Sequence, residues 1–279
     1  MSALLTVARL TIHEAARKRV LLAALVLGLA FVGLDAVGLH FIVRGFAGQT
    51  DPLGVARARF TYAFFTLAGL YAVNFLTALS GVLLPIDTLS GEIASGVMQT
   101  VAAKPVRRSD IVLGKWAAYA TVTVLYLLLL AGGVLLVARL VADYVPPDVP
   151  VGLGLLAIEA VALVTLSITG GTRLATVTNG MLAFGLYGLA LIGGWVEQIG
   201  AHVHNTAARD VGAVASLIMP SESMWQLAAH HMQPPLFAQI QGTPFSPASV
   251  PSTAMVLWAA GWTLAVLALG LRSFARRVL

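Results

Sequence analysis

The sequence predicts an all-α integral membrane protein with six transmembrane helices, and three observations support this prediction: composition, the length of the apolar runs and the placement of charge. Of the 279 residues, 58% are hydrophobic and 10% are charged, against roughly 45–50% and about 25% in typical soluble domains. The apolar residues form runs of about 20, the length that crosses a hydrocarbon layer of ~30 Å. We therefore expect a single membrane domain over residues 1–279.

The N-terminal residues 1–19 precede the first apolar run and have a helical pattern of their own. Apolar side chains fall on one face and basic side chains on another: Leu4, Leu5, Ala8, Ile12 and Ala15 against Arg9, His13 and Arg17. This pattern predicts an elbow helix that lies along the inner leaflet and contacts lipid phosphates. We find no small-residue cleavage site after the first run, so we expect that run to be retained as a helix.

Six runs are long enough to span the bilayer. They are Val20 to Val43, Phe60 to Leu84, Trp116 to Ala138, Val151 to Gly170, Val177 to Val196 and Ser252 to Leu271. The fifth run contains Asn179 and several glycines. Small residues of this kind allow close helix packing in a membrane, and they are also compatible with a subunit seam or a transport path.

Charge placement orients the bundle. If the N-terminus is cytoplasmic, the cytoplasmic segments hold most of the 17 Lys and Arg residues: Arg9, Arg17, Lys18, Arg19, Lys104, Arg107, Arg108, Lys115, Arg173, Arg272, Arg276 and Arg277. Cytoplasmic loops of membrane proteins carry such an excess of Lys and Arg. We therefore predict a multi-pass protein of the cell (inner) membrane with both termini in the cytoplasm.

The connection between the second and third spans predicts an amphipathic surface helix over residues 86–103. Its apolar face comprises Ile86, Leu89, Ile93, Val97 and Val101, and its polar stripe comprises Thr88, Glu92, Ser95 and Gln99. Lys104-Pro105 is expected to end this helix. Ser109 then suits the N-cap of the next helix, with Asp110 favourable in its first turn. The arrangement predicts a rigid surface helix joined by a short elbow to a membrane helix.

A long segment, residues 200–250, separates the fifth and sixth spans and is too polar to cross the bilayer. Val211, Val214 and Ile218 recur at helical spacing, and the stretch from Ser223 to Gln226 has the pattern of a capping box. We predict two short helices that lie at, or dip into, the outer interface, followed by a proline-rich linker.

Three polar residues fall inside predicted spans: Asp35, Asn74 and Glu159. A charge in hydrocarbon costs at least ~2.5–3.5 kcal/mol, so each is expected to face protein or water. They are candidates for a substrate or proton path, and the alternative is a structural hydrogen bond. The outer histidines, His202, His204, His230 and His231, lack a fixed carboxylate or sulfur ligand beside them, so we predict no metal site.

Other function classes find little support in the sequence. The basic residues flank apolar runs, which argues against nucleic acid as a partner, and there is no cysteine. Neither a GxSxG elbow, an HExxH motif nor a phosphate-binding loop is present, so no catalytic residue is predicted and the chain itself is not expected to bind ATP. A polytopic membrane enzyme and an ion-driven secondary transporter remain the alternatives.

The string GEIASGVMQTVAAKPVRRSDIVLGKW, from Gly91 to Trp116, resembles the signature of ABC-2 type permeases. It has a Gly-Glu pair, a Ser-Gly four residues on, a Gln, a Pro followed by basic residues, and Gly-Lys before the next span. The six spans, the amphipathic N-terminus and the large outer segment extend the likeness over the whole chain. Within the family, the chain resembles permeases of bacterial systems with a separate ATPase chain, including those of copper-enzyme maturation.

The resemblance implies a permease subunit that couples ATP hydrolysis by a partner to export or to conformational work. Two ABC ATPase subunits, which carry ATP and Mg, would dock on two permease copies or paralogues, and this chain would bind no cofactor. The helix over 86–103 would be the coupling helix, and the elbow helix could also contact the ATPase. The docking residues that the resemblance implies are Gly91, Glu92, Ser95, Gly96 and Gln99, with Arg107 and Arg108. The outer segment could meet a periplasmic partner.

Overall fold

The computed structural model describes residues 3–98, 107–234 and 250–277, and every regular element in these ranges is a helix. The elements are α1 (Ala3–Arg17), α2 (Arg19–Gly45), α3 (Pro52–Leu83), α4 (Ser90–Ala94), α6 (Arg108–Ala142), α7 (Val149–Gly171), α8 (Thr176–His202), α9 (Thr206–Ile218), α10 (Ser221–Met232) and α11 (Thr253–Ala275). Six of them are long and apolar enough to cross a membrane: α2, α3, α6, α7, α8 and α11. The prediction of an all-α protein with six membrane helices is therefore confirmed.

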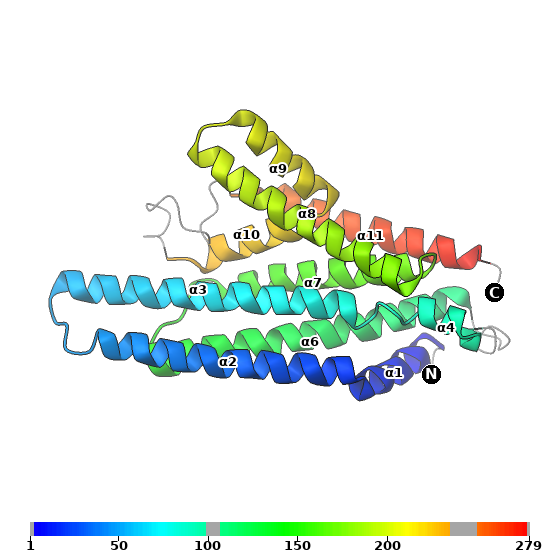
Figure 1. Cartoon of the computed structure of the whole chain (residues 1–279), viewed down its shortest axis with the longest axis horizontal. Helices are drawn as coiled ribbons and strands as arrows, with labels where there is room; N and C mark the ends of the chain where they lie inside the picture. The colour runs from blue at the N-terminus through cyan, green and yellow to red at the C-terminus, as the bar shows by residue number, and fades with distance from the viewer. Residues whose placement is uncertain (1–2, 99–106, 235–249, 278–279) are drawn as a thin grey trace.

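Both termini lie at the same end of the bundle, together with α1 and α4 (Figure 1). We call this the terminal end. The turn between α2 and α3 and the connection between α6 and α7 lie at the opposite end. The first of these turns is well specified, because the Asp51 side chain accepts a hydrogen bond of 2.8 Å from the backbone of Gly54 and Pro52 is the first residue of α3.

The main apolar core lies between α3, α6, α7 and α10. Its fully buried members include Leu67, Leu127, Leu130, Leu156 and Trp225. The outward faces of α2 and α11 are different, since they expose large side chains such as Leu22 and Leu257. Such continuous apolar surfaces require a lipid environment.

The helix α1 packs against the start of α6 at the terminal end. Gly114 permits a close approach, because a Cβ at this position would lie 2.8 Å from Val7. The contact face of α1 therefore includes Val7 and the buried Thr11, whereas Leu5 and Ile12 are exposed. The apolar face predicted from periodicity is thus divided in the structure, since Ala15 is fully buried whereas Leu5 and Ile12 are exposed.

The segment after α3 differs from the single helix predicted over 86–103. Residues 84–89 form turns, α4 has five residues, and Gly96 breaks the helix with φ of 77°. Residues 99–103 and the predicted stop at Lys104-Pro105 lie outside the described residues. The next helix, α6, begins at Arg108 with Arg107 at the N-cap position, so Ser109 is not the cap, while Asp110 does lie in the first turn.

The two helices predicted between the last two spans are present as α9 and α10. α9 folds back along α8, and this pair projects from the body of the bundle (Figure 1). α10 starts at Ser221 rather than at Ser223, without a side-chain cap. It is buried among α3, α7, α8 and α11 instead of lying on the surface. Most of the predicted proline-rich linker falls at 235–249, outside the described residues.

Candidate functional site

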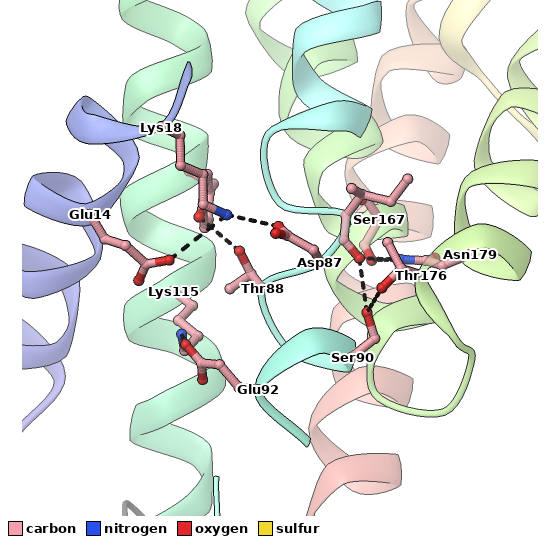
Figure 2. Close-up of polar contacts among 12 residues, drawn as sticks. Glu14, Lys18, Asp87, Thr88, Ser90, Glu92, Lys115, Ser167, Thr176 and Asn179 are labelled. Carbon is pink, nitrogen blue, oxygen red and sulfur yellow. Dashed lines mark hydrogen bonds and ion pairs between the residues drawn. The ribbon is translucent and has the colours of Figure 1, made fainter. Parts of the chain in front are cut away.

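The segment 85–95 at the terminal end is attached by its side chains to the surrounding helices (Figure 2). On one side, Lys18 at the junction of α1 and α2 donates a hydrogen bond of 2.7 Å to Asp87, and its ammonium lies 5.6 Å from the Tyr119 ring centre. Burial would lower the pKa of Lys18, but the bond to Asp87 and the neighbouring Tyr119 raise it above the ordinary value. The junction is therefore held to the segment by a charged lysine.

Two further contacts reach α6. Lys115 and Glu92 form an ion pair with Nζ to Oε1 of 2.6 Å, and Thr88 donates a hydrogen bond of 2.7 Å to the Tyr119 hydroxyl. The Lys115 side chain is 7% exposed and that of Glu92 24% exposed. A charge-assisted bond with this little solvent is stronger than a surface ion pair. Glu92 thus points toward the bundle.

The far side of the segment is held by α7 and α8. The hydroxyls of Ser90 and Thr176 are 2.8 Å apart. Asn179 donates from its amide to the carbonyl of Ser167 at 2.8 Å and to that of Ile86 at 3.3 Å. Asn179 of the glycine-rich span is therefore a structural link between α8, α7 and the segment. Figure 2 shows these contacts on both sides of α4.

The residues that the resemblance indicated for docking are distributed unevenly around α4. Ala94, Ser95 and Val97 are exposed, while Gly91 and Gly96 are half-buried. Gln99 lies outside the described residues. Thr88, predicted on the exposed polar stripe, is buried at 2% exposure because it bonds Tyr119. The exposed part of this segment is thus its turn around residues 94–97.

A second group of contacts, here called the terminal clasp, involves the residues after α11. Arg107 is exposed, but the Arg108 guanidinium donates to the backbone carbonyl of Ala275 at 3.2 Å and also to that of Arg277. Arg277 in turn bonds the carbonyl of Thr172. The clasp therefore joins the start of α6, the end of α11 and the turn between α7 and α8.

Two of the three polar residues predicted inside the spans meet in the core. Asn74 donates to Glu159 at 3.2 Å, and both are buried. Asp35 is also buried, at 5% exposure, but lies against α3, where a Cβ at Gly69 would be 2.7 Å from its carboxylate oxygen. Of the two surroundings expected for Asp35, protein and water, the structure shows protein, because α3 covers it.

Two of these buried charged residues have no counterpart among the predicted site residues. Lys115 is predicted only as a cytoplasmic topology signal just before the third span, and its pairing with Glu92 depends on helix packing that no local pattern shows. Glu222 on α10 is buried at 5% exposure and was not considered. Within the described ranges, no group of three His, Cys, Asp or Glu side chains is placed to hold a metal, and His231 lies 3.7 Å from Asp148.

Six apolar helices around a buried core, with a short segment attached to several of them at one end, define a multi-pass membrane protein. Residues 5–279 match the sequence model described as ABC-2 family transporter protein. The chain therefore belongs to this family and is an ABC-2 type permease. A comparison with curated proteins finds no match to the chain.

Proposed function

We propose that this chain is the permease subunit of an ABC transporter that converts ATP hydrolysis by a separate ATPase into export or conformational work. Membership of the family supports a transport role rather than catalysis. In this proposal ATP and Mg are bound by the ATPase, and this chain binds no cofactor. Two permease subunits, identical or paralogous, and two ATPase subunits form the complete transporter.

The single observation that carries the proposal is the attachment of segment 85–95 to Lys18, Lys115 and Thr176. These residues belong to the α1–α2 junction, to α6 and to α8. Because the three contacts are short, at 2.7, 2.6 and 2.8 Å, a displacement of α4 is passed to three membrane helices instead of being absorbed in a loop. This is the property required of a coupling element.

We assign the docking surface to the exposed turn formed by Ala94, Ser95 and Val97, with Gly91, Gly96 and Arg107 beside it. Glu92 serves as a positioning residue in this assignment, since its carboxylate is held by Lys115. Arg108 is engaged in the terminal clasp. Gln99 remains a candidate from the family resemblance.

The terminal end is cytoplasmic in this proposal, because an ATPase that uses cellular ATP must reach α4 there. The basic residues at this end support the same orientation in the inner membrane. The opposite end and α9 then face outward, where a periplasmic partner could bind. Asn74 and Glu159 are candidates for a path through the bundle, and Asp35, which lies on α2 and faces α3, is a third candidate.

The test uses the full permease co-expressed with its ATPase. Ser95→Trp, which places a bulky ring on the docking turn, is expected to reduce ATPase co-purification by at least tenfold. Ala207→Trp on the exposed start of α9 is the matched control and should leave co-purification unchanged. The orientation is checked with Ser95→Cys, which a membrane-impermeant thiol reagent should reach only from the cytoplasmic side. Normal co-purification with Ser95→Trp, or labelling from outside, would refute the proposal.

A further inference from the structure

The helix α10 is unusual because it is polar and yet buried. Ser221, Glu222, Ser223 and Gln226 are each at most 5% exposed, in a helix that packs on α3, α7, α8 and α11. The Ser221 hydroxyl has no hydrogen-bond partner among the described residues. Burying a polar group without a hydrogen-bond partner is unfavourable. The enclosure of α10 is therefore penalised at Ser221.

Two buried carboxyl groups influence each other electrostatically at this helix. Glu159 of α7 is 2% exposed; Asn74 binds its Oε1, while its Oε2 has no partner among the described residues. Glu222 of α10 acts electrostatically on Glu159 and accepts a hydrogen bond from Gln226. Two ionised carboxylates in such surroundings repel each other and lack counterions. The neutral, protonated form is the one that this packing accommodates.

Glu222 is packed too closely to leave room for a solute beside it, but a proton needs no such room. A Cβ at Gly194 of α8 would lie only 2.3 Å from the Glu222 Cγ. A pocket of about 220 Å³, which is large enough for water, is lined by Glu197, Ser223 and Gln226, and Gln226 bonds Glu222. The structure thus places a pocket with polar lining within one side chain of Glu222.

We propose that Glu159 and Glu222 form a proton-binding site whose occupancy holds α10 inside the bundle, and that loss of the proton releases α10. This inference does not depend on an ATPase, since it concerns only contacts within the bundle. In this proposal α10 is a second element of the permease whose position is controlled by a ligand, the proton, and it is far along the chain from α4.

The groups that face Glu222 from its neighbours are acidic or phenolic. They are Tyr71 on α3, Glu159 on α7, and Tyr187 and Glu197 on α8. The ionisable residues of α9, Arg209 and Asp210, are exposed, and α11 carries its ionisable residue Arg272 in its last turn at the terminal end. His230 and His231 lie in the last turn of α10, two turns from Glu222. None of the four groups that face Glu222 supplies a positive charge, and the Glu197 carboxylate opposes ionisation of Glu222.

The direction of the pH effect follows from these contacts. Burial, partly offset by the Gln226 hydrogen bond, and the Glu197 charge raise the pKa of Glu222 from 4.5 to about 8. The docked state then binds a proton that the released, solvated state loses above pH 4.5. Docking is favoured at low pH and is weakened by roughly tenfold per pH unit until about pH 8. Above that pH the effect levels off.

The absence of cysteine in the chain makes a direct test possible. Ala229→Cys places a thiol on α10 at a position with 0% exposure, and Ala207→Cys places a reference thiol on the exposed start of α9. Detergent-solubilised full-length protein is treated with N-ethylmaleimide between pH 5.5 and 9. The labelling rate of the α10 thiol is divided by that of the α9 thiol, which removes the pH dependence of thiol reactivity. When docking is fast compared with labelling, this ratio follows the fraction of protein in which α10 is released.

We expect the ratio to rise by roughly tenfold per unit from pH 5.5 to 7.5 and to flatten above pH 8. Glu222→Gln, which has the same shape without the charge, should keep the ratio low at every pH. A flat ratio with Glu222 present, or an unchanged pH dependence in Glu222→Gln, overturns the proposal. If Glu222→Gln fails to fold, infrared spectroscopy of the unaltered protein decides: a protonated carboxyl band at pH 6 that disappears by pH 9.5 supports the site, and its absence at pH 6 overturns it.

Discussion

The ion pair between Glu92 and Lys115 allows a quantitative test, because its two partners differ in exposure. Removing the glutamate leaves an ammonium on a side chain that is 7% exposed, whereas removing the lysine leaves a carboxylate on one that is 24% exposed. Breaking a buried pair by losing one partner costs roughly 3–5 kcal/mol, because the remaining charge is not compensated. Since this pair is partly solvated, we expect about 3 kcal/mol for Glu92→Ala and about 1 kcal/mol for Lys115→Met.

The double variant separates the pair from its surroundings. Glu92→Ala with Lys115→Met leaves no isolated charge, so its cost is expected to be about 1–2 kcal/mol, less than the sum of the single changes. The free energy of unfolding of the solubilised full chain, measured by circular dichroism at constant ionic strength, gives all three values. Equal costs for the two single variants, or strict additivity in the double variant, would refute the reasoning from burial.

Three further predictions concern packing, capping and pH. Gly194→Ala should cost about 1–3 kcal/mol of unfolding free energy, because the new methyl meets Glu222; Gly188→Ala, with nothing within 4 Å, is the control and should cost nothing. Asp51→Ala should lower the free energy of unfolding by about 0.5–2 kcal/mol, because the Asp51 side chain caps α3. Ser109→Ala should change the free energy of unfolding by less than about 0.5 kcal/mol, because Ser109 is not the cap of α6. A larger effect for Ser109→Ala than for Asp51→Ala would contradict the assigned helix starts. Because the pKa of Glu222 is raised from 4.5 to about 8, thermal stability should fall as pH rises through this interval and be insensitive to pH above it. A stability that instead increased over the interval would be incompatible with a protonated Glu222.

The membrane helices could be predicted from the sequence because their signal is local. A run of about 20 apolar residues is sufficient to identify a span, and all six runs correspond to helices. The structure extends several of them, as in α6, which begins at Arg108 rather than near Trp116. The extra turns contain Arg108, Asp110 and Lys115, so a hydrophobicity criterion stops short of them.

The burial of α10 could not be predicted in the same way. Its sequence, with Ser221, Glu222 and the paired histidines, has the composition of a surface helix. Only the helices around it decide that it is enclosed. Periodicity likewise failed at Gly96, because a helical wheel does not detect a left-handed backbone conformation.

The contacts that hold α4 were also beyond sequence reasoning. Lys115 lies 23 residues from Glu92, and Thr176 lies 86 residues from Ser90. Such pairs are set by how the helices pack, which no local pattern encodes.

The terminal clasp has a consequence for biogenesis. Arg108 and Thr172 are made early, yet their partners at Ala275 and Arg277 leave the ribosome after every other helix of the bundle. The face that carries α4 is therefore finished last, once α11 is inserted. An incompletely synthesised or wrongly inserted permease lacks these bonds, so a partner that recognises the finished face would select complete subunits.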